Sequence, residues 1–425
     1  MKRVFLWLLM VLVFTALLLG GALGYFYLSV DGDDLPDAGV TFAGQTLSEP
    51  AGYHWELPVL GGLLWRQFDL SPSLASLELE EITAPTAALE LTEGMTEADT
   101  TLSLRTAGGL TVFEGTAAEW KSFTFPRNGE YELTLRAGRM STGQKPARAQ
   151  GYYQYQCRFV VNVQPTLRLS ADQAAQGQVV AVYLSGVLDE SRQAPTAACE
   201  LGPVWFRPTK NGWLGYLPVA YNAEAGDWPV TVTLGDASYT ATLSVRGAEF
   251  PTTTLSDSTP ATEADNEEFR RVIWSLYGQG TNQAYWSGAF RWPVEGASIF
   301  QPYGAYLTDE GSAAGRSANL TLLCPTAAAV VSPAAGQVAY AGSLGLTGNT
   351  VVIDHGCGVK SYLFGLESLA QLTSGSQVEA GQTLGLAGRK LIWEVRIGNK
   401  SVDPAALTRG GSDGLFYRPA GDELM

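Results

Sequence analysis

Histidine is nearly absent from this chain of 425 residues, which contains only His54 and His355. This leaves almost nothing from which to build a zinc centre rich in imidazole or a pair of histidines for acid and base catalysis. Charged residues are also few, at 16 %, and the 27 basic residues are outnumbered by 42 acidic ones. Because the net charge of −15 repels phosphate backbones, we expect no nucleic-acid partner.

Cysteine is scarce as well, and its spacing is not diagnostic. The four cysteines are Cys157, Cys199, Cys324 and Cys357. Their spacing fits neither a dense disulfide scaffold nor a CxxC metal site, so we favour free thiols, with disulfides as the alternative. Hydrophobic residues are plentiful at 46 %, and 48 glycines and 21 prolines accompany them. This balance predicts several folded domains of turn-rich, mainly β architecture.

The N-terminus contains the longest apolar run. Residues 4–30 carry no charge, follow Lys2 and Arg3, and precede an acidic cluster at residues 31–34. The run exceeds the roughly 20 residues that span a bilayer, so we expect residues 1–30 to form a cytoplasmic tip and a single transmembrane anchor, with the bulk of the chain outside. A signal peptide cleaved near Ala22 and Gly24 is the alternative.

Two β-sandwich domains of immunoglobulin-like type are expected to follow, at residues 31–165 and 166–249. In the first, Tyr131–Ala137 alternates apolar and polar residues after an Asn-Gly turn, as a strand with one buried face does. In the second, strands are expected at residues 179–184, 213–218, 229–234 and 239–245, separated by turn residues.

A linker and a helix are expected at residues 250–289. The run from Phe250 to Pro260 is rich in Thr, Ser and Pro, which is typical of a linker. After it, apolar residues recur with helical spacing up to a stop at Gly278, and we expect their stripe to pack against a neighbouring domain. They are Phe269, Val272, Ile273, Leu276 and Tyr277.

The C-terminal part, residues 290–408 with a tail at 409–425, contains five separated motifs. They are FRWPVEG at 290–296, GQV at 336–338, GNTVVIDHG at 348–356, VEAGQTLG at 378–385 and WEVRIGNKSVDP at 393–404. Together and in this order they resemble the M23 (LytM-type) peptidase domain. The resemblance implies a compact β fold, the duplicated hybrid motif, whose active members cut peptide cross-links in bacterial cell walls.

The family's catalytic positions are replaced in this chain. The resemblance implies a zinc held by a histidine, an aspartate four residues later and a second histidine, with a further histidine beside the oxyanion. The first histidine and the aspartate fall on Ser317 and Thr321, the histidine of the oxyanion-side motif falls on Gly365, and the family's pair of histidines near the end falls on Lys390 and Ile392. Because a hydroxyl is a poor zinc ligand and isoleucine has no donor atom, we expect no metal and no cofactor.

The remaining candidates have both a functional and a packing interpretation. His355 corresponds to a strand-end turn of the family, so we expect it to be structural. Trp292, Tyr303 and Trp393 are candidates for a binding groove, and core packing is the alternative for the tryptophans.

The sequence therefore predicts a catalytically inactive, membrane-anchored M23-like protein of the bacterial cell membrane. Such family members act as scaffolds or regulators of the cell envelope, so the expected ligand is an envelope protein or peptidoglycan. Two alternatives remain: an active zinc endopeptidase with a non-standard ligand set, and a purely structural spacer. A former zinc groove that is open would favour ligand binding, and one filled by side chains from residues 316–323 would favour the spacer.

Overall fold

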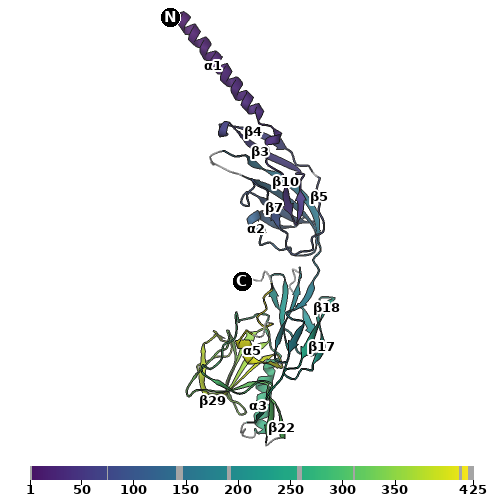
Figure 1. Cartoon of the computed structure of the whole chain (residues 1–425), viewed down its shortest axis with the longest axis vertical. Coiled ribbons are helices and arrows are strands. Elements are labelled where there is room, and N and C mark those ends of the chain that lie inside the picture. The colour runs from purple at the N-terminus through teal and green to yellow at the C-terminus, as the bar shows by residue number, and fades with distance from the viewer. Residues whose placement is uncertain are drawn as a thin grey trace. The chain divides into compact units, whose positions relative to one another are not determined.

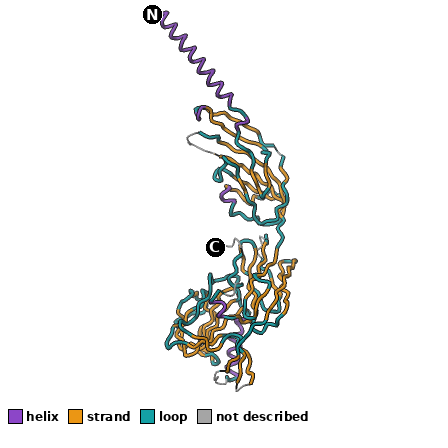
Figure 2. The backbone as a smooth tube through the Cα atoms, in the orientation of Figure 1, coloured by secondary structure: helices purple, strands orange, loops and turns teal. Residues whose placement is uncertain are grey.

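The structure is a computed structural model that describes residues 2–73, 75–139, 147–188, 193–255, 261–309, 312–410 and 414–419. The chain divides into two compact units (Figures 1 and 2). One comprises Met1–Gln164 with Leu188–Glu190, and the other comprises Pro165–Val187 with Ser191–Met425. The finer division into two sandwiches and a separate C-terminal domain stays a prediction.

The first unit begins with a long apolar helix, α1 (Lys2–Ser29), whose described side chains are all exposed. By length and composition it can cross a membrane. Arg66 of β4 holds its C-terminal end, since the guanidinium donates to the carbonyls of Tyr27, Leu28 and Val30. A cation at this end of a helix also complements the helix dipole.

Two antiparallel sheets enclose the core of the first unit. The larger has the order β4 (Leu64–Leu70), β3 (Gly52–Val59), β10 (Gln150–Val161), β9 (Gly129–Arg139), β7 (Thr101–Thr106) and β8 (Thr111–Thr116), with β5 (Leu77–Glu78) parallel to β10. The smaller has the order β2 (Gln45–Leu47), β1 (Val40–Phe42) and β6 (Leu89–Glu90), and the one-turn helix α2 (Ala117–Trp120) follows β8. The strand expected at 131–137 lies within β9.

The second unit opens with two four-stranded sheets. One has the order β11 (Thr166–Leu169), β13 (Val179–Ser185), β16 (Gly212–Pro218) and β15 (Arg207–Thr209). The other has the order β12 (Gln173–Ala175), β18 (Ala237–Arg246), β17 (Gly226–Leu234) and β14 (Thr196–Ala198). All four strands expected from the sequence here are present, each within two or three residues of its expected bounds.

The C-terminal part of this unit is built on a nine-stranded sheet. Its order is β20 (Ser298–Gln301), β23 (Leu320–Leu323), β29 (Thr383–Ile397), β27 (Val359–Leu369), β26 (Gly348–Gly356), β25 (Gly336–Leu344) and β28 (Gln377–Val378), and β24 (Ala329–Val331) and β30 (Lys400–Val402) also pair with β29. The helix α5 (Pro404–Thr408) follows.

The expected linker and tail are more ordered than their composition indicates. Within the linker, β19 (Thr252–Thr254) pairs with β21 (Tyr306–Asp309), which pairs with β22 (Ser312–Arg316), whereas 256–260 lies outside the described residues. In the tail, Leu415 is buried and its carbonyl accepts a hydrogen bond from Trp286. The pairing of β19 with β21 and the burial of Leu415 hold the described parts of these segments.

The sandwich and the nine-stranded sheet share one hydrophobic core. Val179, Ala181 and Tyr183 on the outer face of β13 belong to the same buried cluster as Val351 and Leu363 of the C-terminal sheet. Trp205 adds to this contact, because a Cβ at Gly358 or Gly398 would lie 2.1 Å and 2.8 Å from its ring. Both faces of β13 and β16 are buried for this reason.

Candidate functional site

The structure brings four of the five predicted family positions together on the neighbouring strands β23, β27 and β29, and Ser317 lies before β23. Thr321 of β23 lies directly opposite Ile392 of β29, and Ile392 lies opposite Phe364 of β27. Gly365 follows Phe364, and a Cβ there would lie 3.2 Å from the carbonyl oxygen of Lys390. Thr321 and Ile392 therefore lie side by side on one face of the sheet, and Gly365 lies beside them.

Side-chain alternation separates this face from the core of the sheet. Leu363, Leu391 and Trp393 point into the cluster shared with the sandwich. Tyr362, Phe364 and Ile392 contribute instead to a second cluster on the opposite face, as successive residues of a strand do.

A helix covers this second face. It comprises α3 (Glu263–Phe269), the π-helical turn η3 (Arg270–Trp274) and α4 (Ser275–Tyr277) (Figure 1). The five residues of its predicted apolar stripe all pack in the cluster with Tyr362, Phe364 and Ile392, and the rings of Phe269 and Phe364 lie 6.0 Å apart. The predicted packing face is thus directed at the sheet that carries the family positions.

The helix has polar attachments to the sheet. Near the end of α3, the side chain of Glu268 accepts a 2.9 Å hydrogen bond from the amide of Gly345. At the C-terminal end of the helix, the guanidinium of Arg396 lies 4.7 Å from the centroid of the Tyr277 ring. The ammonium of Lys360 donates to the carbonyl of Gln279. These contacts attach the helix to the strands at Glu268 and at its C-terminal end.

Buried charges supply the attachments at the C-terminal end of the helix. Lys360 is 1 % exposed, lies 3.4 Å from Asp354, and has its pKa lowered by burial. An oxygen of Glu394, which is 5 % exposed, lies 2.6 Å from Arg396, and burial raises the pKa of this carboxyl. Charges taken out of water need such partners, so the pairs fix the arrangement of the strands beneath the helix.

The replaced positions do not present a set of zinc donors. Thr321 is buried opposite an aliphatic side chain, Gly365 has no side chain, and the ammonium of Lys390 lies 4.2 Å from the ring centroid of Phe300. Among the described residues, no group of three His, Cys, Asp or Glu is placed to hold a metal ion. The residues present at the family positions therefore do not fit the zinc that the resemblance implies.

Ser317 is buried and its hydroxyl is already engaged. The Oγ accepts a 3.0 Å hydrogen bond from Gln301 and donates one of 2.8 Å to the carbonyl of Asn319. Activation of a serine needs an adjacent base. The hydrogen bonds of Ser317 show no such base.

The two histidines have other partners. His355 is fully buried; its Nδ1 donates to the carbonyl of Ala335 at 2.9 Å, and its Nε2 lies 2.8 Å from the hydroxyl of Ser361. Burial lowers its pKa to about 4, so the imidazole is neutral and accepts from Ser361. His54, in β3 of the first unit, lies 2.5 Å from Asp69.

Two of the three groove candidates, Trp393 and Tyr303, are buried, and Trp292 is half-buried. Trp393 is 0 % exposed, and Trp292 lies against it with ring centroids 5.8 Å apart. Tyr303 is 4 % exposed; its hydroxyl donates to the carbonyl of Ser401 and accepts from the amide of Tyr221. Trp393 and Tyr303 therefore belong to the interior, as the packing alternative predicts for the tryptophan.

Sequence reasoning missed the charged residues beneath the helix. Lys360 and Arg396 lie in otherwise apolar strands, and this local violation of the pattern was the available signal. Sequence spacing alone could not show which segment would face them.

The sequence model of peptidase family M23 matches residues 317–404. No curated protein matches the chain. Among solved structures, a protein from Pseudomonas aeruginosa assigned to the M23 peptidases is 21 % identical, with 55 % of this chain and 94 % of that chain covered and a TM-score of 0.43. A chain of the SpoIIQ–SpoIIIAH pore-forming complex is 17 % identical, with 28 % of this chain and 91 % of that chain covered and a TM-score of 0.26. A zinc-containing peptidase from Vibrio cholerae is 12 % identical, with 71 % of this chain and 84 % of that chain covered and a TM-score of 0.24.

At these identities and TM-scores the solved structures add nothing to the sequence match, which falls on β23 through the start of α5 and contains every replaced position. The chain therefore carries a domain of peptidase family M23 at residues 317–404.

Proposed function

We propose that this protein is a non-hydrolytic, membrane-tethered scaffold of the bacterial cell envelope, in which the M23 domain has kept its fold and no longer binds zinc. The single observation that carries the proposal is the packing of Ile392. Its side chain lies between Thr321 and Phe364 on the sheet and joins the cluster formed with the helix at 263–277. An aliphatic residue in this environment supplies packing and no donor atom.

The covered face also bears on the spacer alternative. In the spacer alternative, side chains from residues 316–323 fill the former groove. The residues that pack over Phe364 and Ile392 are instead those of the helix, Phe269 and Val272 among them. A face closed by the protein's own helix supports a structural contribution of this domain, with ligand contacts elsewhere on the chain.

The tether and the partner are the finer parts of the proposal. Helix α1 is apolar and exposed along its whole length, and Lys2 and Arg3 precede its hydrophobic run. The positive-inside rule then places the N-terminus in the cytoplasm and the β domains outside the membrane, where an envelope protein or peptidoglycan is the available partner.

Zinc stoichiometry and hydrolysis test the proposal. The full chain is purified in detergent micelles, incubated with zinc, desalted and analysed by elemental analysis. In parallel, it is incubated with purified cell walls, with an active M23 peptidase as the positive control. We expect no stoichiometric zinc and no release of peptides.

About one zinc per chain, together with cleavage of cell-wall peptides, would favour the enzyme alternative with a non-standard ligand set and refute the proposal. A chelator should leave the melting temperature unchanged, because packing and not ligation holds this domain together.

A further inference from the structure

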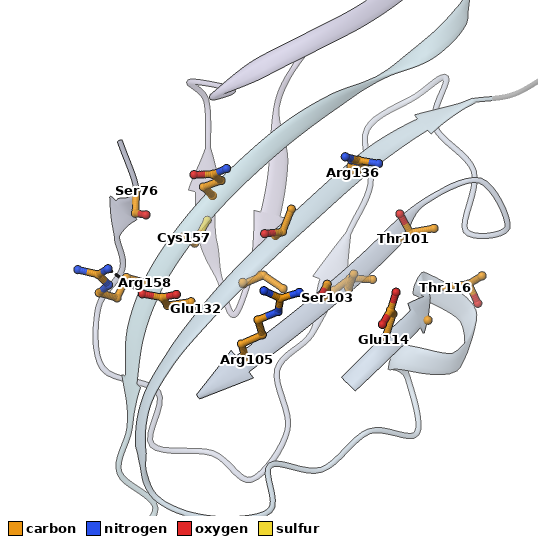
Figure 3. Close-up of a pocket in the computed structure, with 15 residues that line it drawn as sticks. Ser76, Thr101, Ser103, Arg105, Glu114, Thr116, Glu132, Arg136, Cys157 and Arg158 are labelled. Atoms are coloured by element: carbon orange, nitrogen blue, oxygen red, sulfur yellow. Dashed lines mark hydrogen bonds and ion pairs between the residues drawn. The ribbon is translucent and has the colours of Figure 1, made fainter. Parts of the chain in front are cut away.

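The outer face of the large sheet in the first unit forms an open cleft of about 740 Å³. Its floor consists of the central strands β7, β9 and β10, and residues of β8 and the segment before β5 line its sides (Figure 3). The M23 domain takes no part in it. The cleft is therefore a separate feature that the proposed scaffold role does not explain.

The side chains on the cleft floor follow the strand register. Ser103 of β7 lies opposite Thr134 of β9, which lies opposite Gln156 of β10. In the next row along the strands, Arg105 lies opposite Glu132, which lies opposite Arg158. Adjacent strands are about 4.8 Å apart, so each row presents three polar side chains in line across the sheet, one from each strand.

The apolar residues that line the cleft contribute little of its surface. Leu102, Leu133 and Cys157 are at most 1 % exposed, because their side chains point to the core on the other side of the sheet. Small-molecule pockets and the centres of protein interfaces are mostly apolar. The cleft instead offers hydroxyl, amide, carboxylate and guanidinium groups, which suit a hydroxyl-rich ligand.

Several of these groups have spare hydrogen-bonding capacity. Arg158 donates to Glu132 at 2.7 Å, and Arg136 donates to Gln154 at 2.9 Å. No hydrogen bond or ion pair to another described residue occupies the side chains of Arg105 and Glu114. Arg105 lies on the strand next to that of Glu132, and Glu114 lies at the side of the cleft away from Arg158 (Figure 3). Arg105 is therefore a free bidentate donor for a carboxylate.

The charge of the cleft contrasts with that of the whole chain. Three arginines and two glutamates line it, whereas the chain carries −15 in total. The excess of arginine in the cleft favours a ligand with a modest number of carboxylates, whereas the negative charge of the rest of the chain repels such a ligand. The floor strands are paired on both sides, so an extended peptide has no free strand edge to join.

We propose that this cleft is a binding site for a carboxylate-bearing saccharide strand, with Arg105 as the main anion contact and the Ser103–Thr134–Gln156 row contacting sugar hydroxyls. This inference is independent of the chemistry of the M23 domain, because the site lies in the other unit.

The test uses the full chain in detergent micelles and isothermal titration calorimetry. The probes are a β-1,4-linked hexaglucuronate and cellohexaose, which share a backbone and differ in the carboxylates, with hexaglutamate as a peptide of similar charge. We expect the hexaglucuronate to bind, more weakly at high salt. Cellohexaose and hexaglutamate should each bind at least about tenfold more weakly.

Two substitutions of opposite effect identify the site. Arg105→Ala should weaken hexaglucuronate binding by about tenfold or more, since a charge-assisted hydrogen bond is lost. Glu114→Gln should strengthen it, because a nearby negative charge is removed. Arg127→Ala removes the same charge from an exposed position of the first unit that does not line the cleft, and it should change affinity by less than about twofold.

Melting curves of the variants should match that of the unaltered chain, because the substituted side chains are exposed. The proposal is overturned if the hexaglucuronate does not bind at millimolar concentration, or if Arg127→Ala weakens binding as much as Arg105→Ala. Equal affinity for hexaglutamate would overturn the saccharide assignment.

Discussion

Replacing Ile273 by alanine should loosen the helix that covers the M23 sheet. Ile273 is 1 % exposed and packs with Val352, Tyr362 and Phe364 beneath the helix. Isoleucine to alanine removes three carbon atoms, which costs about 2.4 kcal/mol at roughly 0.8 kcal/mol each, before any cavity term. If the helix opens locally, its opening equilibrium rises by about 50-fold.

Hydrogen exchange followed by mass spectrometry measures this effect directly. Amides of residues 263–277 should exchange about 50-fold faster in Ile273→Ala, and those of β27 and β29 should also lose protection. The matched control is Trp274→Ala, because Trp274 is the next residue and its side chain is 54 % exposed. It should change exchange by less than about threefold. Equal effects of the two substitutions would refute the assignment of this helix as a packed cover.

Three further substitutions test the interior of the second unit. Arg396→Met leaves the buried Glu394 without its partner and should destabilise the unit by about 3–5 kcal/mol at pH 7. Because burial raises the pKa of Glu394, the folded state binds a proton there before the unfolded state does, so this loss should shrink as the pH falls from 7 toward the ordinary value of 4.5 and change no further below it, as urea unfolding at several pH values would show. Burial lowers the pKa of His355 to about 4 from 6.5, so protons bind the unfolded state first and stability should fall by about 3 kcal/mol as the pH drops from 7 to 4. His355→Gln should remove that component, and an unchanged pH dependence would contradict the buried neutral imidazole. Gly358→Ala places a Cβ 2.1 Å from the ring of an indole and should cost about 3 kcal/mol, whereas Gly348→Ala, also at positive φ but with no atom within 4 Å, should cost about 1 kcal/mol in the same assay.

The sequence indicated the strands well because their side chains obey a local rule. Residues alternate between two faces in β9, and the strand expected at 131–137 was correctly placed from this alternation and an Asn-Gly turn. The helix stripe at 269–277 was visible for the same reason, because residues three and four positions apart share a helix face. Both rules require only neighbours in the chain.

Pairing between strands that lie far apart in the chain could not be predicted from these local rules. Thr252–Thr254 has the composition of a linker, and it becomes a strand because β21, more than 50 residues later, offers an edge to it. The groove candidate Trp393 illustrates the same limit, since its position in the shared core depends on a sandwich that ends about 150 residues earlier. Composition cannot report such long-range contacts.

By itself the sequence determined the residue types at the family positions: an isoleucine, a glycine and a threonine cannot supply imidazole or carboxylate ligands wherever the fold puts them. Only the tertiary structure decided that Thr321, Ile392 and Gly365 are neighbours and that the helix at 263–277 lies over them. The functional group of a side chain is fixed by the residue type. Its contacts depend on how strands that are far apart in the chain pair and pack.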